Sequence, residues 1–265
     1  MSVAIVIPAR YASSRYPGKP LVALRGANGV AKSLIRRSWD AACTARGVDR
    51  VVVATDDDRI ADHARGFGAE VVMTPDTCRN GTERCAAALP ALDGVDLVVN
   101  LQGDAPLTPP WFVEALIEGM ADADGFAAAT PVLRCDAEAH RRFVEDRAAG
   151  RVGGTTAVFD RHGRALYFSK EVIPYTGRMF TDDQPCPVFH HVGVYAYRPD
   201  ALRAYASWPE GGLEGWEGLE QLRFLENGAA VKCVEVDGKG RAFWELNNPV
   251  DVDRVELALR EAGID

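Results

Sequence analysis

The chain has 265 residues, of which 47% are hydrophobic and 26% are charged, as in ordinary globular proteins. Its formal net charge of −8 argues against a nucleic-acid partner, which would need a broad basic face, but leaves room for a small cluster of positive charge. No apolar run approaches the roughly 20 residues of a membrane span, and the first one is too short for a signal peptide. We therefore expect a cytoplasmic protein that binds neither nucleic acid nor membrane.

The six cysteines show no CxxC pair and no metal-like spacing, so we expect reduced and mostly buried thiols. They are Cys43, Cys78, Cys85, Cys135, Cys186 and Cys233.

Short apolar strands alternate with helical patterns in the N-terminal half. The predicted strands are residues 3–7, 50–54, 69–73 and 97–101, and the predicted helices are residues 31–46, 58–66, 82–89 and 110–121. Continuous apolar runs separated by helices indicate a mostly parallel sheet with helices on both faces. Ligands of such sheets bind at the carboxyl ends of the strands. The fold class is therefore α/β.

The C-terminal half is less regular. Strands are predicted at 126–132, 155–159, 165–168, 191–197 and 231–236, and helices at 200–208, 217–227 and 250–262. The Pro-rich residues 173–187 have few helix signals and are expected to leave the sheet. With no long linker and no repeat, we expect a single domain over 1–265, with an arm around 155–198.

A basic loop follows the first strand. Arg10, Arg15 and Lys19 place three positive charges within ten residues, and Gly18 allows close approach of a ligand. Arg suits bidentate phosphate recognition, and Lys acts as a point charge. The loop is neither a Walker A motif nor a GxGxxG fingerprint. From charge alone, an anion site and a merely solvated basic loop remain equally open.

Two further segments could carry chemistry. Asp104 follows a buried strand and a Gly, where it could hold Mg²⁺ together with phosphate and water or simply make a local turn bond. Gly81 and Thr82 could open a helix, with Asn80 or Thr82 as its cap, and a helix N-terminus favours anions. Taken alone, this second segment is a weak signal for a ligand, and capping is its plain explanation.

The order of several motifs makes a family resemblance specific. The motifs are PARYASSRYPGKPL, VVVATDD, GTER, NLQGDAP, ALYFSKEVIP, HVGVYAYR and LEQLR, and they span most of the chain. This pattern resembles the 3-deoxy-manno-octulosonate (Kdo) cytidylyltransferase family, whose members make a CMP-sugar from CTP. The resemblance implies a Rossmann-like nucleotide-diphospho-sugar transferase fold, a homodimer formed through the arm, and Mg²⁺ as cofactor.

The resemblance also implies roles for individual residues. Those implied to bind the nucleotide are Ala9, Arg10, Ser14, Arg15, Lys19, Asn80, Gly81, Arg84 and Gln102. Those implied in catalysis are Lys19, Arg15 and Asp104, with Asp104 and Asn247 at the metal. Those implied to bind the acceptor are His191, Glu220 and Gln221.

The implied reaction is phosphoryl transfer. An acceptor oxygen attacks the α-phosphorus of CTP in line, and pyrophosphate leaves. The protein then mainly positions the reactants and neutralises charge, with Lys19 and Arg15 at the leaving group. An acidic acceptor is already ionised at neutral pH, so a dedicated general base is not obligatory.

The sequence departs from the family pattern near the acceptor end. Ala105 stands where the family usually has Glu, Asn247 where it has Asp, Thr156 where it has Lys, and His190 where it has Arg. A unit charge pair about 6 Å apart at an effective dielectric of about 20 is worth roughly 3 kcal/mol, so losing two acidic groups eases entry of a more negative acceptor. On this ground we favour a phosphonate such as phosphonoformate, with Kdo or a related sugar acid as the alternative. A non-catalytic CTP-binding protein is the second alternative.

Overall fold

The computed structural model describes residues 1–12, 16–152, 154–241, 246 and 248–265. Its strands are β1 Val3–Ala9, β2 Ala23–Arg25, β3 Ala31–Ser33, β4 Arg50–Thr55, β5 Glu70–Met73, β6 Leu97–Leu101, β7 Ala128–Arg134, β8 Thr155–Phe159, β9 Ala165–Ser169, β10 Phe189–His191, β11 Val194–Tyr197 and β12 Val231–Glu235. Its α-helices are α1 Leu34–Ala42, α2 Asp58–Gly66, α3 Gly81–Ala88, α4 Pro110–Ala121, α5 Ala137–Ala148, α6 Pro199–Ser207, α7 Gly212–Glu217, α8 Leu222–Glu226 and α9 Val252–Glu261. Short 3-10 turns cover Lys19–Leu21, Leu89–Ala91 and Pro249–Asp251.

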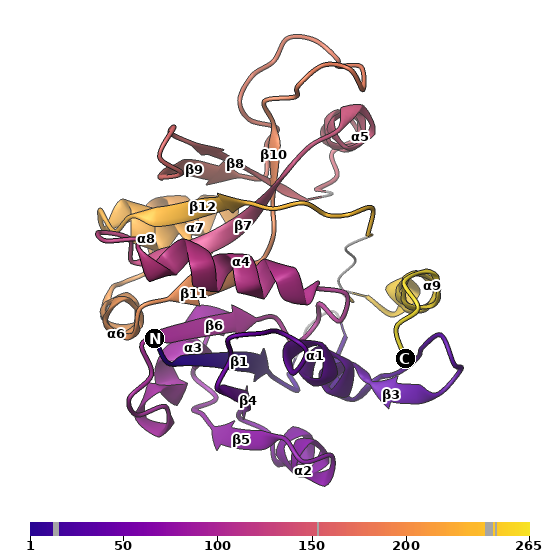
Figure 1. Cartoon of the computed structure of the whole chain (residues 1–265), viewed down its shortest axis with the longest axis vertical. Coiled ribbons are helices and arrows are strands. Elements are labelled where there is room, and N and C mark those ends of the chain that lie inside the picture. Colours follow the sequence, from indigo (N-terminus) through magenta and orange to yellow (C-terminus); the bar gives the residue numbers. More distant parts are fainter. Residues whose placement is uncertain (13–15, 153, 242–245, 247) are drawn as a thin grey trace.

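One large sheet runs through the molecule, in the order β5-β4-β1-β6-β11-β7-β10-β8-β9, with β12 also paired to β7 (Figure 1). Strands β5, β4, β1 and β6 are parallel, as predicted for the N-terminal half, and β12 is parallel to β7. The strands β8 to β11 pair antiparallel with their neighbours. The predicted α/β class is confirmed, and the antiparallel pairs belong to its C-terminal half.

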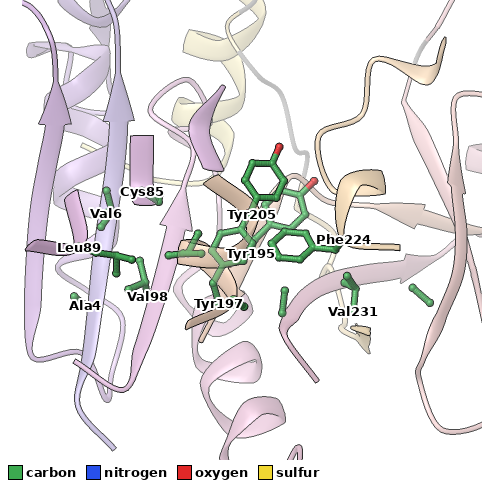
Figure 2. Packing of buried hydrophobic residues seen from close by; sticks show 14 of the residues in the cluster. Ala4, Val6, Cys85, Leu89, Val98, Tyr195, Tyr197, Tyr205, Phe224 and Val231 are labelled. Atoms are coloured by element: carbon green, nitrogen blue, oxygen red, sulfur yellow. The ribbon is translucent and has the colours of Figure 1, made fainter. Parts of the chain in front are cut away.

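Helices cover both faces of this sheet. On one face, α1, α2 and α4 pack on alternate residues of β1, including Ile5 and Ile7. On the other face, α3, α6 and α8 pack on Ala4 and Val6, and Figure 2 shows Cys85 and Leu89 reaching toward those two residues. Side chains alternate between the two faces of a strand, which is why a continuous apolar run marks a strand covered on both sides.

Several elements differ from the sequence prediction. The helix expected from residue 31 begins at Leu34, because Ser33 caps it by accepting a hydrogen bond from the Arg36 amide, and residues 31–33 form a hairpin with β2. The helix expected over 217–227 begins only at Leu222, as α8, because Gly218 takes a left-handed φ of 61° and ends the preceding helix α7 at Glu217. The strand expected over 191–197 is split into β10 and β11. Helix α5, capped by Asp136, was not predicted.

The predicted arm around 155–198 contains elements of two kinds. Strand β11 lies between β6 and β7 inside the sheet, whereas the chain between β9 and β10 leaves the sheet and packs on α5 (Figure 1). Phe180 and Cys186 of that excursion lie against Phe143 of α5. The role of the arm in forming a homodimer stays a prediction. Among the described residues, no helix combines the length and the apolar character needed to cross a bilayer.

Candidate functional site

A cleft of about 260 Å³ opens at the carboxyl ends of β1 and β6. Its walls are the start of the basic loop, the N-terminus of α3 and the loop after β6. The residues that line it are Pro8, Ala9, Arg10, Lys19, Pro20, Cys78, Arg79, Asn80, Gly81, Arg84, Gln102, Gly103 and Asp104. The structure thus brings together every predicted nucleotide-binding residue that it describes. Ser14, Arg15 and Asn247, predicted for the phosphates and the metal, lie outside the described residues.

Lys19 and Asp104 meet inside this cleft. The Lys19 ammonium lies 2.6 Å from the Oδ2 atom of Asp104, and both side chains are largely shielded from solvent. Gly18 turns the chain into Lys19 with a left-handed φ of 71°, and its amide donates to the Tyr11 carbonyl. The backbone turn therefore directs a cation and a carboxylate, donated by segments far apart in the sequence, to one point.

The loop that carries Asp104 is held tightly. A Cβ atom at Gly103 would come within 2.7 Å of the Pro8 carbonyl oxygen, so the loop can pass the end of β1 only with glycine there. The Ser38 hydroxyl donates to the Gly103 carbonyl at 3.1 Å, and the Leu246 amide donates to the Asp104 carbonyl at 3.0 Å. Asp104 is thereby fixed from β1, from α1 and from the segment that precedes α9.

The N-terminus of α3 forms the opposite wall. Asn80 is its cap, since its Oδ1 atom accepts from the Glu83 amide at 2.8 Å, and its Nδ2 atom donates to the Tyr205 hydroxyl. A Cβ atom at Gly81 would approach the side-chain amides of Asn100 and Gln102 to 3.1 Å. Gly81 therefore lets the start of the helix lie directly over these two side-chain amides. Of the two candidate caps, Asn80 and Thr82, it is Asn80 that caps the helix.

Arg84 presents a buried guanidinium to the same cleft. Its Nη1 atom donates to the Thr74 hydroxyl at 2.6 Å and lies 3.5 Å from Asp56. Cys78 also lines the cleft and was not a predicted site residue. Burial raises the pKa of the Cys78 thiol, so this thiol stays protonated at neutral pH.

The predicted acceptor residues lie on β10 and just before α8. His191 is buried, its Nδ1 atom lies 2.9 Å from the Thr155 hydroxyl, and burial lowers its pKa to about 3. Burial raises the pKa of Glu220 to about 7, and the carboxylate accepts from the Thr82 amide at 3.3 Å. Gln221 is buried as well. His191 is therefore neutral, while Glu220 titrates near neutral pH.

Some polar atoms here have no protein partner. Among the described residues, Nε2 of His191, Nε2 of Gln221 and both amide atoms of Asn100 are buried without a hydrogen bond. Such atoms cost free energy unless a ligand or water satisfies them. Asn100 of β6 lies opposite Tyr195 of β11, whose ring is 5.6 Å from that of His191. Asn100 was not predicted as a site residue, although a lone amide in the apolar strand LVVNL was the available signal.

Comparison with known proteins identifies the family. The cytidylyltransferase family model matches residues 4–235. A 3-deoxy-manno-octulosonate cytidylyltransferase of Maricaulis maris is 44% identical over 264 residues, covering 99% of both chains. An 8-amino-3,8-dideoxy-manno-octulosonate cytidylyltransferase of Shewanella frigidimarina is 41% identical, covering 98% of this chain and 99% of its own. The chain belongs to the Kdo cytidylyltransferase family.

A solved structure agrees with this assignment. The CMP:2-keto-3-deoxy-manno-octonic acid synthetase complexed with CTP superimposes with a TM-score of 0.83 at 33% identity, covering 99% of this chain and all of the other. The nucleotide-diphospho-sugar transferase fold is thereby confirmed, and so is membership of a nucleotidyltransferase family.

Two departures from the family pattern acquire a structural explanation. The Thr156 hydroxyl donates to the Glu171 carbonyl at 2.6 Å and accepts from the Ile173 amide, so it anchors the start of the excursion. The His190 ring packs against Phe143 at a centroid distance of 5.3 Å, and burial lowers its pKa to about 4. In this cytidylyltransferase both positions are therefore uncharged, with Thr156 serving as a hydrogen-bonding anchor and His190 as a packing residue.

The described residues offer limited means to hold a metal. They contain no cluster of three or more His, Cys, Asp or Glu side chains suited to an ion. Within the lining of the cleft, Asp104 is the one carboxylate that the structure describes. A single carboxylate that faces bound phosphates nevertheless fits Mg²⁺, which usually keeps waters and takes phosphate oxygens as its other ligands.

Proposed function

We propose that this enzyme transfers the cytidylyl group of CTP to Kdo and releases pyrophosphate. An acceptor oxygen forms a bond to the α-phosphorus while the bond from that phosphorus to the bridging oxygen breaks, and the electron pair leaves with pyrophosphate. The relatives that are most informative carry Kdo or its 8-amino analogue in their names. This supports the sugar acid, which the sequence left as the alternative, over the phosphonate.

One observation carries the choice of acceptor. The buried atoms without a partner at Asn100, His191 and Gln221 belong to neutral groups, which suit hydroxyl groups better than phosphonate oxygens. Glu220, with a pKa raised to about 7 by burial, adds partial negative charge beside them. A phosphonate would need cations there, whereas Arg10, Lys19 and Arg84 line the nucleotide cleft. A sugar acid carries several hydroxyl groups and a single negative charge, so it needs less positive charge at this position than a phosphonate does.

The residues of the cleft divide the catalytic work. Lys19 and Arg10 attract the triphosphate, and the amides of Asn80 and Gln102 face the base and ribose. Asp104, with the side chain at position 247, would hold Mg²⁺, which supplies neutralising charge to the phosphates. The buried side chains of Asn100, His191 and Gln221 would orient the acceptor, so positioning and charge neutralisation provide most of the rate enhancement.

Pyrophosphate release tests this proposal. The enzyme is incubated with CTP and Mg²⁺, and Kdo, 8-amino-3,8-dideoxy-manno-octulosonate or phosphonoformate is supplied separately. We expect turnover with Kdo and none after chelation of the metal. Turnover with phosphonoformate alone would overturn the sugar-acid acceptor, and preference for the 8-amino analogue would move the assignment to that acceptor. Silence with every acceptor, with CTP binding intact, would indicate a binding protein.

A further inference from the structure

A buried arginine lies behind the two substrate regions without lining the cleft. Arg223 of α8 is 1% exposed, and its Nε and Nη2 atoms each lie 2.6 Å from a carboxylate oxygen of Glu214 in α7. Its remaining terminal nitrogen, Nη1, lies 3.2 Å from Glu83 of α3. One guanidinium therefore holds two carboxylates that belong to different parts of the fold.

The α3 end of this contact leads directly to the nucleotide wall. The second oxygen of Glu83 accepts from the Arg79 amide at 2.8 Å, and the amide of Glu83 is the group that Asn80 caps. Tyr205, whose ring lies 4.1 Å from the Arg223 guanidinium, accepts from the Asn80 side chain at 3.0 Å. Figure 2 shows Tyr205 beside Phe224, the residue after Arg223. Arg223 thus supports both ends of the turn that presents Asn80 and Gly81.

On its other side, Arg223 is linked to the predicted acceptor-binding residues through its own helix, α8. Glu220 and Gln221 immediately precede α8, and Gln221 is its N-terminal cap residue. The Glu220 carboxylate accepts from the Thr82 amide, so the acceptor segment also contacts the start of α3. The turn of α3 and the start of α8 are consequently joined at two points, Glu220 to Thr82 and Arg223 to Glu83.

We propose that Arg223 is a positioning residue. It sets the distance between the nucleotide half-site, which contains Asn80 and Gly81, and the acceptor half-site, which contains Glu220 and Gln221. An in-line attack requires the two reactants at a fixed distance and angle, and small misplacements are costly. A bidentate guanidinium suits this task because its planar fork fixes the angle as well as the distance of each partner. The nucleotide part of this inference needs only the family assignment, and the acceptor part rests on the proposed function.

The test uses variants that keep the buried charge balanced where they can. Arg223→Lys keeps one positive charge but cannot bridge Glu214 and Glu83 together. Glu83→Gln breaks the contact from the other side. Arg37→Lys is the matched control, since Arg37 is equally buried but donates to the Leu24 and Val30 carbonyls in the hairpin, away from the cleft. CTP affinity is measured by calorimetry, KM and kcat by pyrophosphate release with Kdo, and the thermal midpoint by fluorescence.

We expect Arg223→Lys and Glu83→Gln each to raise both the Kd of CTP and the KM of Kdo about tenfold, because either change releases both half-sites. The combined effect of the double variant is expected to be smaller than the product of the two single effects, because both changes remove the same Arg223–Glu83 contact, although Arg223 also pairs with Glu214 and Glu83 with Arg79. Arg37→Lys is expected to lower the thermal midpoint and leave both constants unchanged.

Several results would overturn the positioning role. One is a fall in thermal midpoint for Arg223→Lys with unchanged Kd and KM, as for the Arg37 control. Another is a fully additive double variant. A Glu83→Gln effect confined to CTP would also remove the link to the acceptor. If Kdo itself were not turned over, the Kd of CTP would still test the nucleotide part, so this failure differs from that of the proposed function.

Discussion

At the scale of single residues, the pairing of Lys19 with Asp104 is the most informative feature of the cleft. Opposite charges 2.6 Å apart hold each other in place before substrates bind. In the proposed reaction, the triphosphate would offer Lys19 another anion, and the metal ion would offer Asp104 another cation. The pair keeps both side chains oriented toward the cleft in which these roles are proposed.

Replacing Asp104 by Asn is the sharpest test of this pair. We expect kcat to fall by about 10²–10³, because the proposed Mg²⁺ loses a charged ligand, and with the ion the phosphates lose a neutralising charge. Without Mg²⁺, however, CTP should bind at least as tightly as it does to the unaltered enzyme, because Lys19 no longer has a competing carboxylate. Pyrophosphate release and calorimetry measure the two quantities.

The control for this change is Asp57→Asn. Asp57 follows the neighbouring strand β4, caps α2 and pairs with Arg59, but it does not line the cleft. It should leave kcat and the affinity for CTP unchanged. Weaker CTP binding by Asp104→Asn in the absence of metal would contradict the competition between Asp104 and the phosphates for Lys19.

Sequence reasoning selected most of the residues that line the cleft, but it missed Asn100, which lies opposite Tyr195 and outside the lining of the cleft. Charged and Gly-rich segments such as Arg10 to Lys19 and Asn80 to Arg84 stand out, because nothing in a core explains them. Asn100 lies inside an apolar strand, where periodicity assigns it only a place in the sheet. Its importance emerges from the absence of a partner for its amide among the described residues, which requires coordinates.

At the scale of elements, β10 has an unusual electrostatic character. It carries two adjacent histidines, and burial lowers the pKa of His190 to about 4 and that of His191 to about 3. The unfolded chain takes up protons near the ordinary value of 6.5, whereas the folded chain does so only at lower pH. The stability that these histidines contribute is present above pH 6.5 and is lost as the pH falls toward 4 and then 3.

His190→Gln should reduce this acid sensitivity. The lowered pKa of His190 reduces the free energy of unfolding by about 3 kcal/mol between pH 7 and pH 4, whereas Gln does not titrate and contributes no such loss. Urea unfolding at several pH values from 7 to 4 should therefore show a shallower decline for the variant. Glu220 contributes to the pH dependence in the opposite direction, because the stability linked to its raised pKa is lost as the pH rises through about 7. This contribution is the same in the variant and in the unaltered protein, so it cancels when their curves are compared.

The exposed His162, in the turn between β8 and β9, is the matched control. His162→Gln removes an exposed imidazole by the same substitution, so a shallower decline seen only for His190→Gln belongs to the buried position. Parallel curves for His190→Gln and the unaltered protein would show that His190 is protonated in the folded state near its ordinary pH.

Elements were predictable where local pattern and tertiary context agree. Strands β1, β4 and β6 are largely apolar because both faces of the sheet are covered there, so their type was evident. Helix α5 buries only His140 and Phe143. Among its many charged residues, this buried stripe is too narrow to produce a recognisable helical pattern of apolar residues in the sequence. The division into β10 and β11 depends on pairing: β10 joins β7 and β8, whereas β11 joins β6 and β7. Pairing partners are not written in the local sequence.

At the scale of the whole molecule, a satellite core supports the cleft from the side of α9. Leu24, Leu107, Leu246, Val255 and Leu259 form a cluster separate from the cores on the two faces of the sheet. Figure 1 shows α9 beside the hairpin that contains β3, away from the strands β8 and β9. Because Leu246 belongs to this cluster and its amide donates to the Asp104 carbonyl, packing around α9 reaches the loop that carries the predicted metal ligand.

Leu259→Ala should therefore affect both stability and function. Loss of the buried side chain is expected to lower the free energy of unfolding by about 2–5 kcal/mol. The Mg²⁺ concentration that gives half-maximal pyrophosphate release should also rise, because the Leu246 contact that fixes Asp104 loosens. Leu116 of α4 is equally buried, but it belongs to the core between the sheet and helices α1, α2 and α4. Leu116→Ala should therefore lower stability similarly without changing the Mg²⁺ requirement. An equal Mg²⁺ requirement for the two variants would mean that the satellite core stabilises the fold but does not position Asp104.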